Sequence, residues 1–157
     1  MIAAGQTIDT AFTLKVVQDG EVREVVFRDL LTKPVIVSVY MKNNTGSCDK
    51  QNDSLVAHAS EFAKAGYRLI ALSRDTCGSH LKYAAKKNIT YTLASDPSDA
   101  FARATDSLVE KSMYGRTFQG PVRAAYIINT QGKVLRVIEK VDTKDHSAQI
   151  KAALATL

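Results

Sequence analysis

Two cysteines are the residues of this 157-residue chain best suited to redox chemistry. Cys48 follows a polar segment and precedes a run of apolar residues at helical spacing, so we expect it in the first turn of a helix. Unpaired backbone N–H groups and the positive end of the helix dipole favour a thiolate over a thiol there. Cys48 is therefore a candidate nucleophile.

The alternative for Cys48 is a small buried hydrophobic residue, which a free cysteine commonly is. Its sequence neighbours argue against that reading because they are polar. These neighbours are Asn43, Asn44, Ser47, Asp49 and Lys50.

Two further residues have side chains that can act on a thiolate or its substrate. Thr45 lies three positions before Cys48, and its hydroxyl either caps the helix or donates to a substrate oxygen beside the sulfur. Arg123 opens an apolar strand, where a permanent cation is costly unless it faces an anion such as a thiolate. Its alternative is a strand-end arginine that reaches solvent. Arg116, in a glycine-flanked loop, is predicted to be a surface residue outside the site.

Cys77 is predicted in the first turn of a second helix, with His80 three residues after it. Such a pair can act as thiol and base or form half of a metal site. There is no second Cys–His pair, and His58 and His146 fall on predicted helix exteriors. We therefore interpret the histidines as solvated or capping, and expect no metal or other cofactor.

The composition restricts partners and location. Twenty-one basic and 16 acidic residues give a formal charge of +5, but no Lys–Arg block is interleaved with aromatic residues as nucleic-acid binding requires. Apolar runs such as 35–40 are too short to span a bilayer. The cysteines do not form a disulfide framework, and the N-terminus does not resemble a secretory signal. We expect a cytoplasmic protein that binds neither nucleic acid nor membrane.

Strands and helices alternate along a single domain, residues 1–157, which predicts an α/β fold with a central mixed β-sheet flanked by helices. An Asp-Gly pair at 19–20 predicts an N-terminal β-hairpin. The predicted strands are 12–17, 22–27, 34–40, 67–73, 90–94, 122–129 and 134–141. The predicted helices are 48–65, closed by Gly66; 75–88, capped by Asp75; 96–104; and a terminal helix with Ile150, Ala153 and Leu157. Residues 108–120 are predicted to be a loop.

The segment Met41-Lys42-Asn43-Asn44-Thr45-Gly46-Ser47-Cys48 resembles the active-site loop of peroxiredoxins. It is most similar to the bacterioferritin comigratory protein (PrxQ) branch, whose loop reads Pro-Lys-Asp-Asn-Thr-Pro-Gly-Cys. Other segments resemble the family in the same order: Gly5…Asp9…Phe12-Thr13-Leu14, Ser73-Arg74-Asp75…Ser79-His80, Ser95-Asp96-Pro97, 113–118 and 123–128. The resemblance implies a thioredoxin-like fold and a thiol-dependent peroxidase.

By this resemblance Cys48 is the peroxidatic cysteine. Its thiolate attacks the O–O bond of hydrogen peroxide or an organic hydroperoxide and becomes a sulfenic acid. Thr45 hydrogen-bonds the peroxide, and Arg123 holds the thiolate and polarises the O–O bond.

The loop departs from the family pattern at two places. Met41 stands where the family has proline, and Gly46-Ser47 replaces the Pro-Gly pair before Cys48. Met41 can still shield the sulfur from water, but the loop loses two rigid residues. We expect the activity to be retained, at a rate that looser positioning can lower.

In this branch the resolving cysteine commonly occupies the position of Asp53 or one aligned with Ala84, and neither is cysteine here. Cys77 lies two helical turns before Ala84 on the same helix face, so it is a candidate displaced resolver. Its disulfide would be reduced by thioredoxin or a similar dithiol. The alternatives are a one-cysteine enzyme resolved by an external thiol, or a thioredoxin-fold redox sensor or binding protein with weak catalysis. We expect a monomer or weak homodimer.

Overall fold

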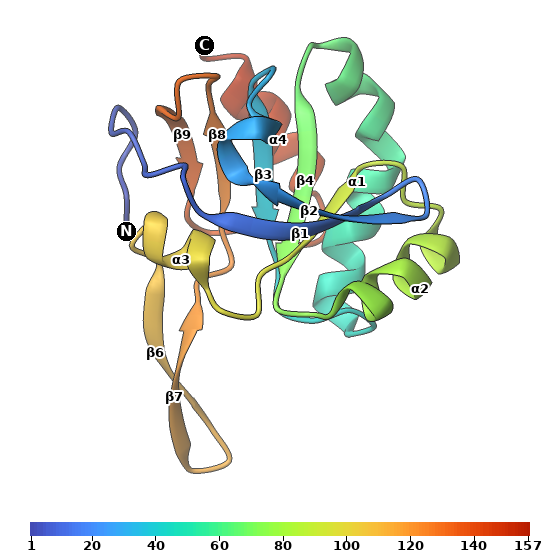
Figure 1. The fold of residues 1–157 in the computed structure, drawn as a ribbon, viewed down its shortest axis with the longest axis vertical. Helices are drawn as coiled ribbons and strands as arrows, with labels where there is room; N and C mark the ends of the chain where they lie inside the picture. The colour runs from blue at the N-terminus through green and yellow to red at the C-terminus, as the bar shows by residue number, and fades with distance from the viewer.

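A seven-stranded sheet runs through the centre of the computed structural model, which describes residues 1–157 (Figure 1). Its strand order is β2-β1-β5-β4-β3-β8-β9. These strands are β1 (Thr13–Gln18), β2 (Glu21–Val26), β3 (Val35–Val39), β4 (Arg68–Ser73), β5 (Thr92–Ser95), β8 (Ala125–Ile128) and β9 (Val134–Ile138). β3, β4 and β5 are parallel to their mutual neighbours, whereas the remaining pairs are antiparallel. The predicted mixed sheet is confirmed.

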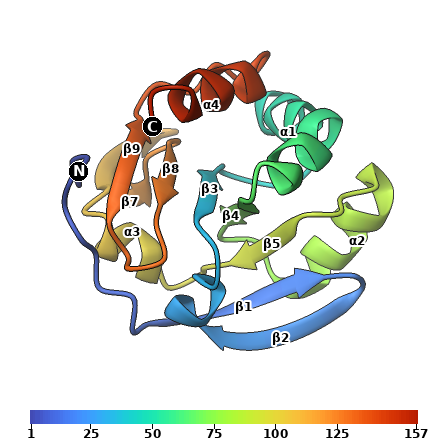
Figure 2. The same ribbon diagram turned by 90° about the horizontal axis from the view of Figure 1, so that it is seen from above.

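Helical segments cover both faces of this sheet (Figure 2). They are α1 (Gly46–Lys64), α2 (Cys77–Lys87), α3 (Ala100–Ala104), α4 (His146–Leu154) and a 3₁₀ turn, η1 (Phe27–Leu30). Core residues from α1, α2 and α4 share one apolar cluster, and those from α3 and η1 share the other. None of the helices is both long and apolar enough to cross a bilayer.

β3 lies at the centre of the sheet and is buried along its whole length. Successive side chains of a strand point to opposite faces. Accordingly Val35, Val37 and Val39 belong to the cluster with α3, and Ile36 belongs to the cluster with α1. Because β3 is covered on both faces, both sets of its side chains are mostly apolar, which explains the continuous β-branched run. The loop that follows β3 therefore starts from the edge of a rigid core.

The N-terminal hairpin of β1 and β2 is confirmed. Asp19 and Gly20 join the strands with φ angles of 53° and 75°. A type I′ turn, whose twist matches that of the two strands, requires positive φ at both central residues. Glycine adopts positive φ without steric cost.

The prediction of a loop over residues 108–120 is wrong. These residues form a second hairpin, β6 (Leu108–Met113) and β7 (Arg116–Pro121), which projects from the body of the molecule (Figure 1). Most of its side chains are exposed, so the strands lack the apolar alternation by which sequence reveals a strand. The local signal was the turn, Tyr114-Gly115, whose φ angles are 53° and 76°.

Several predicted boundaries also change. Thr76, and not Asp75, caps α2, because its hydroxyl accepts the Ser79 N–H at 3.2 Å. α4 ends at Leu154, so Leu157 lies beyond the terminal helix. The last two strands of the sheet are shorter than predicted but pair as the expected antiparallel hairpin. α1 begins two residues before Cys48, and Gly66 follows its end with φ 92°.

Replacing Leu55 with alanine tests the packing of α1 against the sheet. Leu55 is 0% exposed within the cluster that also contains Cys48. Its loss removes buried apolar area and leaves a cavity, so the free energy of unfolding should fall by about 2–5 kcal/mol. Urea denaturation measures this change. Leu157→Ala is the control, since Leu157 is 51% exposed, and an equal loss in both variants would contradict the packing described.

Candidate active site

Cys48 is the third residue of α1, with Thr45 as the N-cap residue. The backbone carbonyl of Thr45 accepts the first helical bond from the Asp49 N–H at 2.7 Å. The residue Cys48 is only 1% exposed, and it packs among apolar side chains of the α1 cluster. The predicted first-turn position is confirmed, and it places the sulfur where N–H groups are free and water is largely excluded.

Opposing effects act on ionisation of the Cys48 thiol. Burial raises the pKa, because it penalises the charged form. The Thr45 hydroxyl and the backbone of Lys42 and Met41 lower it through hydrogen bonds, and the charge of Arg123 lowers it further. The lowering effects prevail, so the pKa of Cys48 lies below the ordinary value for cysteine and the thiolate is favoured.

The Thr45 side chain does not cap α1. Its hydroxyl donates to the Lys42 carbonyl at 2.8 Å, within the loop that precedes the helix. A hydroxyl has one proton and rotates freely about its C–O bond. Thr45 can therefore turn this donor from the Lys42 carbonyl to the Cys48 thiolate, and this is the hydrogen bond by which it lowers the pKa of Cys48.

Arg123 lies between β7 and β8, and its guanidinium reaches the first turns of α1. Nη1 donates to the Gln51 Oε1 at 2.7 Å, and Nη2 donates to the Ser47 Oγ at 3.3 Å. Arg123 forms no ion pair with a carboxylate. The structure thus holds Arg123 against the first turns of α1, close enough for its charge to lower the pKa of Cys48.

Gln51 fixes this arginine through a chain of buried hydrogen bonds. Its Nε2 donates to the Ser38 Oγ at 2.8 Å, and Ser38 lies 3.0 Å from the Nε2 of His146. The Nδ1 of His146 lies 3.1 Å from the Gln149 Oε1. All donors and acceptors are matched when Nδ1 carries the imidazole proton and Ser38 donates to Nε2. Gln51, Ser38 and His146 are all 0% exposed, so the chain holds its geometry without competition from water.

The sequence-based prediction that His146 lies on a helix exterior is therefore wrong. The prediction of a solvated or capping role is also wrong for His80. His80 is 0% exposed beneath the active-site loop. Its Nε2 lies 3.1 Å from the Ala94 carbonyl, and its Nδ1 lies 3.1 Å from the Nδ2 of Asn43. Burial lowers the pKa of His80, against the opposing Asp75 charge and Ala94 hydrogen bond. Histidine spacing alone could not show this burial.

Asn43 anchors the loop between β3 and α1 to the start of α2. Its N–H donates to the Asp75 Oδ2 at 3.0 Å, and its Nδ2 donates to the Ser79 Oγ at 3.1 Å. The Tyr40 hydroxyl donates to the Asn43 Oδ1 at 2.5 Å. These contacts give the loop a fixed shape, although it lacks the prolines of the family pattern.

Cys77 is the first residue of α2 and is partly exposed. It packs against the apolar cluster that contains Cys48, and neither cysteine is in a disulfide. α2 and α1 are connected by the Tyr83 hydroxyl, which donates to the Asp49 Oδ1 at 2.7 Å. The two cysteines thus stand at the N-termini of two helices that contact each other.

Met41 and Lys111 border the same site. The Lys111 ammonium, from β6, donates to the Met41 Sδ at 3.0 Å. Arg116 sits at the exposed turn of the hairpin, as predicted. Sequence reasoning missed Lys111 because the hairpin was not recognised, and it missed Gln51 although the i, i+3 spacing from Cys48 marks a shared helix face.

Comparisons with known proteins give a consistent result. The model of the AhpC/TSA family matches residues 5–137. Peroxiredoxin Bcp of Xanthomonas campestris is 32% identical over 120 residues, covering 76% of this chain and 75% of the relative. The putative peroxiredoxin bcp of Haemophilus influenzae is 31% identical over 147 residues, covering 94% of this chain and 93% of the relative.

Solved structures agree with these matches. A structure of Xanthomonas campestris peroxiredoxin Q superimposes with a TM-score of 0.85 at 28% identity, covering 98% of this chain and 97% of that one. A second, which concerns the alkyl peroxide reduction activity of the bacterioferritin comigratory protein of the same species, also has a TM-score of 0.85 at 28% identity, covering 98% of each chain. The alignments therefore extend over nearly the entire fold.

Replacing Arg123 with glutamine should raise the pKa of Cys48. The guanidinium charge favours the thiolate, so its removal shifts ionisation toward higher pH. The rate of iodoacetamide alkylation as a function of pH measures the shift, in a Cys77→Ser background that leaves one thiol. Arg23→Gln is the control, because Arg23 lies on β2 and pairs with Glu21. An unchanged midpoint in Arg123→Gln would contradict the electrostatic role of Arg123.

Proposed function

Because the chain belongs to the AhpC/TSA family, and is a peroxiredoxin with the predicted thioredoxin-like fold, we propose that Cys48 is its peroxidatic cysteine. The observation that carries this assignment is the Cys48 environment: a nearly buried sulfur in the first turn of α1, with a lowered pKa and a fixed arginine. Cys77, the other cysteine, starts α2 and is more exposed than Cys48.

The first step is a nucleophilic displacement at oxygen. The Cys48 thiolate attacks the distal oxygen of a hydroperoxide, the S–O bond forms, and the O–O bond breaks. The alkoxide or hydroxide that leaves takes a proton and departs as alcohol or water. In this step the Thr45 hydroxyl donates to the peroxide, and Arg123 stabilises the charge that moves from sulfur to oxygen. Sulfur is oxidised by two electrons and the peroxide is reduced by two.

The second step forms a disulfide. The Cys77 thiol attacks the Cys48 sulfenic acid, the S–S bond forms, and water leaves. Disulfide closure requires Cα atoms within about 7 Å, so the first turn of α1 unwinds unless the two sites already meet that limit. Unwinding breaks two contacts of that turn: the Asp49–Tyr83 hydrogen bond of 2.7 Å, and the 3.2 Å bond from Asn52 to the Cys48 carbonyl.

A dithiol of the thioredoxin type then reduces the disulfide and returns both thiols. Peroxiredoxin Q of Xanthomonas campestris has been solved in two forms with different single cysteines replaced by serine, which supports an assignment to two cysteines. The setting that suits this cycle is a reducing cytoplasm, with the chain acting as a monomer or weak homodimer.

Replacing Cys48 with serine should abolish peroxide consumption by the purified protein, since a hydroxyl at this position does not ionise at neutral pH. Oxidation of ferrous iron by residual hydrogen peroxide measures the loss. The control is Cys77→Ser, which keeps the first step and should still consume one equivalent of peroxide. Sustained turnover by Cys48→Ser would overturn the assignment. If the unaltered protein reacts with hydrogen peroxide no faster than the free amino acid cysteine does, the result would favour a redox sensor.

Intact mass after one equivalent of hydrogen peroxide tests the resolving cysteine. We expect the unaltered protein to lose two hydrogens as a monomer, and the Cys77→Ser variant to gain one oxygen. A persistent added oxygen in the unaltered protein would instead identify a one-cysteine enzyme that an external thiol resolves. A dimer on a non-reducing gel would show that the bond forms between chains.

A further inference from the structure

The hairpin of β6 and β7 has two chemically different faces. Residues directly opposite in an antiparallel pair point to the same side. One face therefore combines Val109, Lys111 and Met113 with Gly120, Phe118 and Arg116, which stand opposite them. The other combines Glu110 and Ser112 with Gln119 and Thr117, and has the apolar pair Leu108 and Pro121 at its base. Apolar and cationic side chains share the first face, and the strands' one acid lies on the second.

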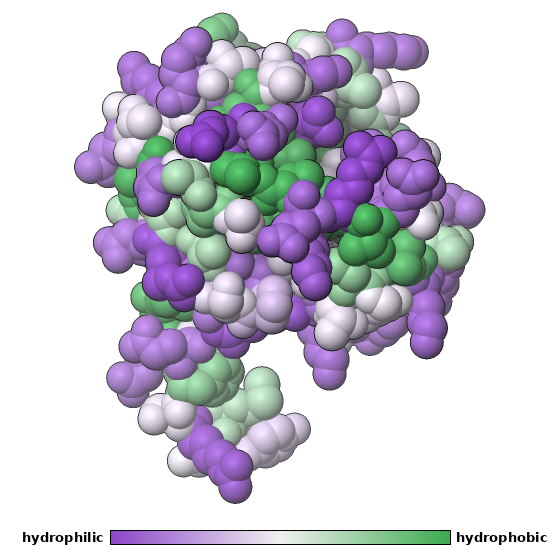
Figure 3. Space-filling view, in the orientation of Figure 1, coloured by the Kyte–Doolittle hydropathy of each residue, from purple (hydrophilic) through white to green (hydrophobic).

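The apolar and cationic face is the one that reaches the active site. Lys111 belongs to this face, and its ammonium meets the Met41 Sδ at 3.0 Å in the loop before Cys48. Met113, Phe118 and Val109 are exposed beside it, at 58%, 40% and 40%. Figure 3 shows the hairpin extending from the body with apolar surface between charged groups. A molecule bound at Cys48 therefore meets apolar surface and an ammonium next to it.

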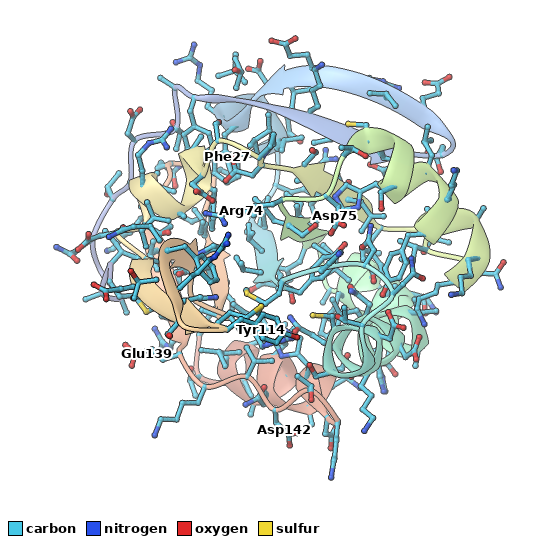
Figure 4. All side chains as sticks on the ribbon, turned by 90° about the horizontal axis from the view of Figure 1, so that it is seen from below. Phe27, Arg74, Asp75, Tyr114, Glu139 and Asp142 are labelled. Atoms are coloured by element: carbon cyan, nitrogen blue, oxygen red, sulfur yellow. The ribbon has the colours of Figure 1, made fainter.

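Positive charge at this entrance exceeds negative charge. Arg74 pairs with Asp99 at 2.5 Å and also donates to the Gln119 carbonyl at 2.9 Å, so it lies at the hairpin (Figure 4). Lys111 and Arg123 have no carboxylate partner. Burial lowers the pKa of Lys111, and the nearby charges of Arg74 and Arg123 lower it further, against the Cys48 thiolate. Once the thiolate is counted against Arg123, the Lys111 ammonium has no anionic partner, and its only hydrogen bond is to the neutral Met41 sulfur.

We propose that Lys111 forms a subsite for the negative charge of an organic hydroperoxide that carries a carboxylate. The apolar body of this substrate lies against Phe118 and Val109, and the carboxylate accepts from the Lys111 ammonium. The inference rests on the proposed function, because the peroxide group must reach Cys48. The carboxylate takes no part in the chemical step: the O–O bond still breaks at the sulfur, and the leaving alkoxide still takes the proton.

Two hydroperoxides that differ only in charge test this subsite. Cumene hydroperoxide and its para-carboxylate present the same body and the same peroxide group. We expect the unaltered protein to have the higher kcat/KM for the carboxylate. Lys111→Gln should lower the ratio of the two kcat/KM values about tenfold, the change that follows from losing one charge-assisted contact. Lys111→Glu should lower the ratio further, whereas Lys111→Arg should keep it.

Ionic strength provides a readout that a purely structural role would not move. Added salt should lower the ratio for the unaltered protein and leave the ratio for Lys111→Gln nearly constant, because screening acts on the charge that the variant lacks. Lys64→Gln is the matched control. Lys64 is exposed at the far end of α1, and its loss should leave the ratio unchanged.

Equal ratios in the unaltered protein, Lys111→Gln and Lys111→Glu would overturn the subsite. The subsite would also be overturned if Lys111→Gln keeps the higher kcat/KM for the carboxylate substrate and the full salt dependence of the ratio. Another cation would then bind the carboxylate. Hydrogen peroxide separates this failure from a failure of the proposed function. If the unaltered protein reduces neither hydrogen peroxide nor either organic substrate, the proposed function fails, and not the subsite alone.

Discussion

The stabilisation of a buried anion is the constraint on which the site depends. Cys48 is almost fully enclosed, and enclosure by itself opposes the thiolate that the chemistry needs. Fixed dipoles and one fixed charge stabilise the thiolate against this effect. The dipoles are the start of α1 and the loop amides, and the charge is that of Arg123. Because these groups are already in place, little reorganisation accompanies the reaction. The chain from Gln51 through Ser38 to His146 extends this fixation across the core to α4.

The proposed cycle requires a rigid loop before α1 and a first turn of α1 that rearranges after oxidation. Asn43 supplies rigidity that the family pattern obtains from proline, through bonds to Tyr40, Asp75 and Ser79. These bonds hold the segment before the helix. The bonds that unwinding must break, at Asp49 and Asn52, lie within the helix itself. The two demands therefore fall on different hydrogen bonds, so the first turn of α1 can open while the loop stays attached to α2.

The sequence predicted what local spacing and chemistry determine. The first-turn position of Cys48, the approach of Arg123 and the buried β3 strand all follow from pattern and charge. Burial of His80 and His146 does not, because it depends on which elements pack over them. The β6–β7 hairpin was not predicted, because most of its side chains are exposed. For the same reason the position of Lys111 beside Met41 was not predicted. The sequence left two roles open for Thr45. The capping role is wrong, because the hydroxyl bonds the Lys42 carbonyl, and the contact with a substrate oxygen stays a prediction.

The position of the hairpin separates the surface that a substrate meets from the core packing around Cys48. β6 and β7 form a sheet of their own and touch the body chiefly where Arg74 and Met41 meet them, whereas the groups around Cys48 belong to the core. Substitutions on the hairpin therefore alter the entrance without disturbing the packing that stabilises the thiolate. The choice of substrate can therefore change through this arm alone, while the packing around Cys48 stays the same.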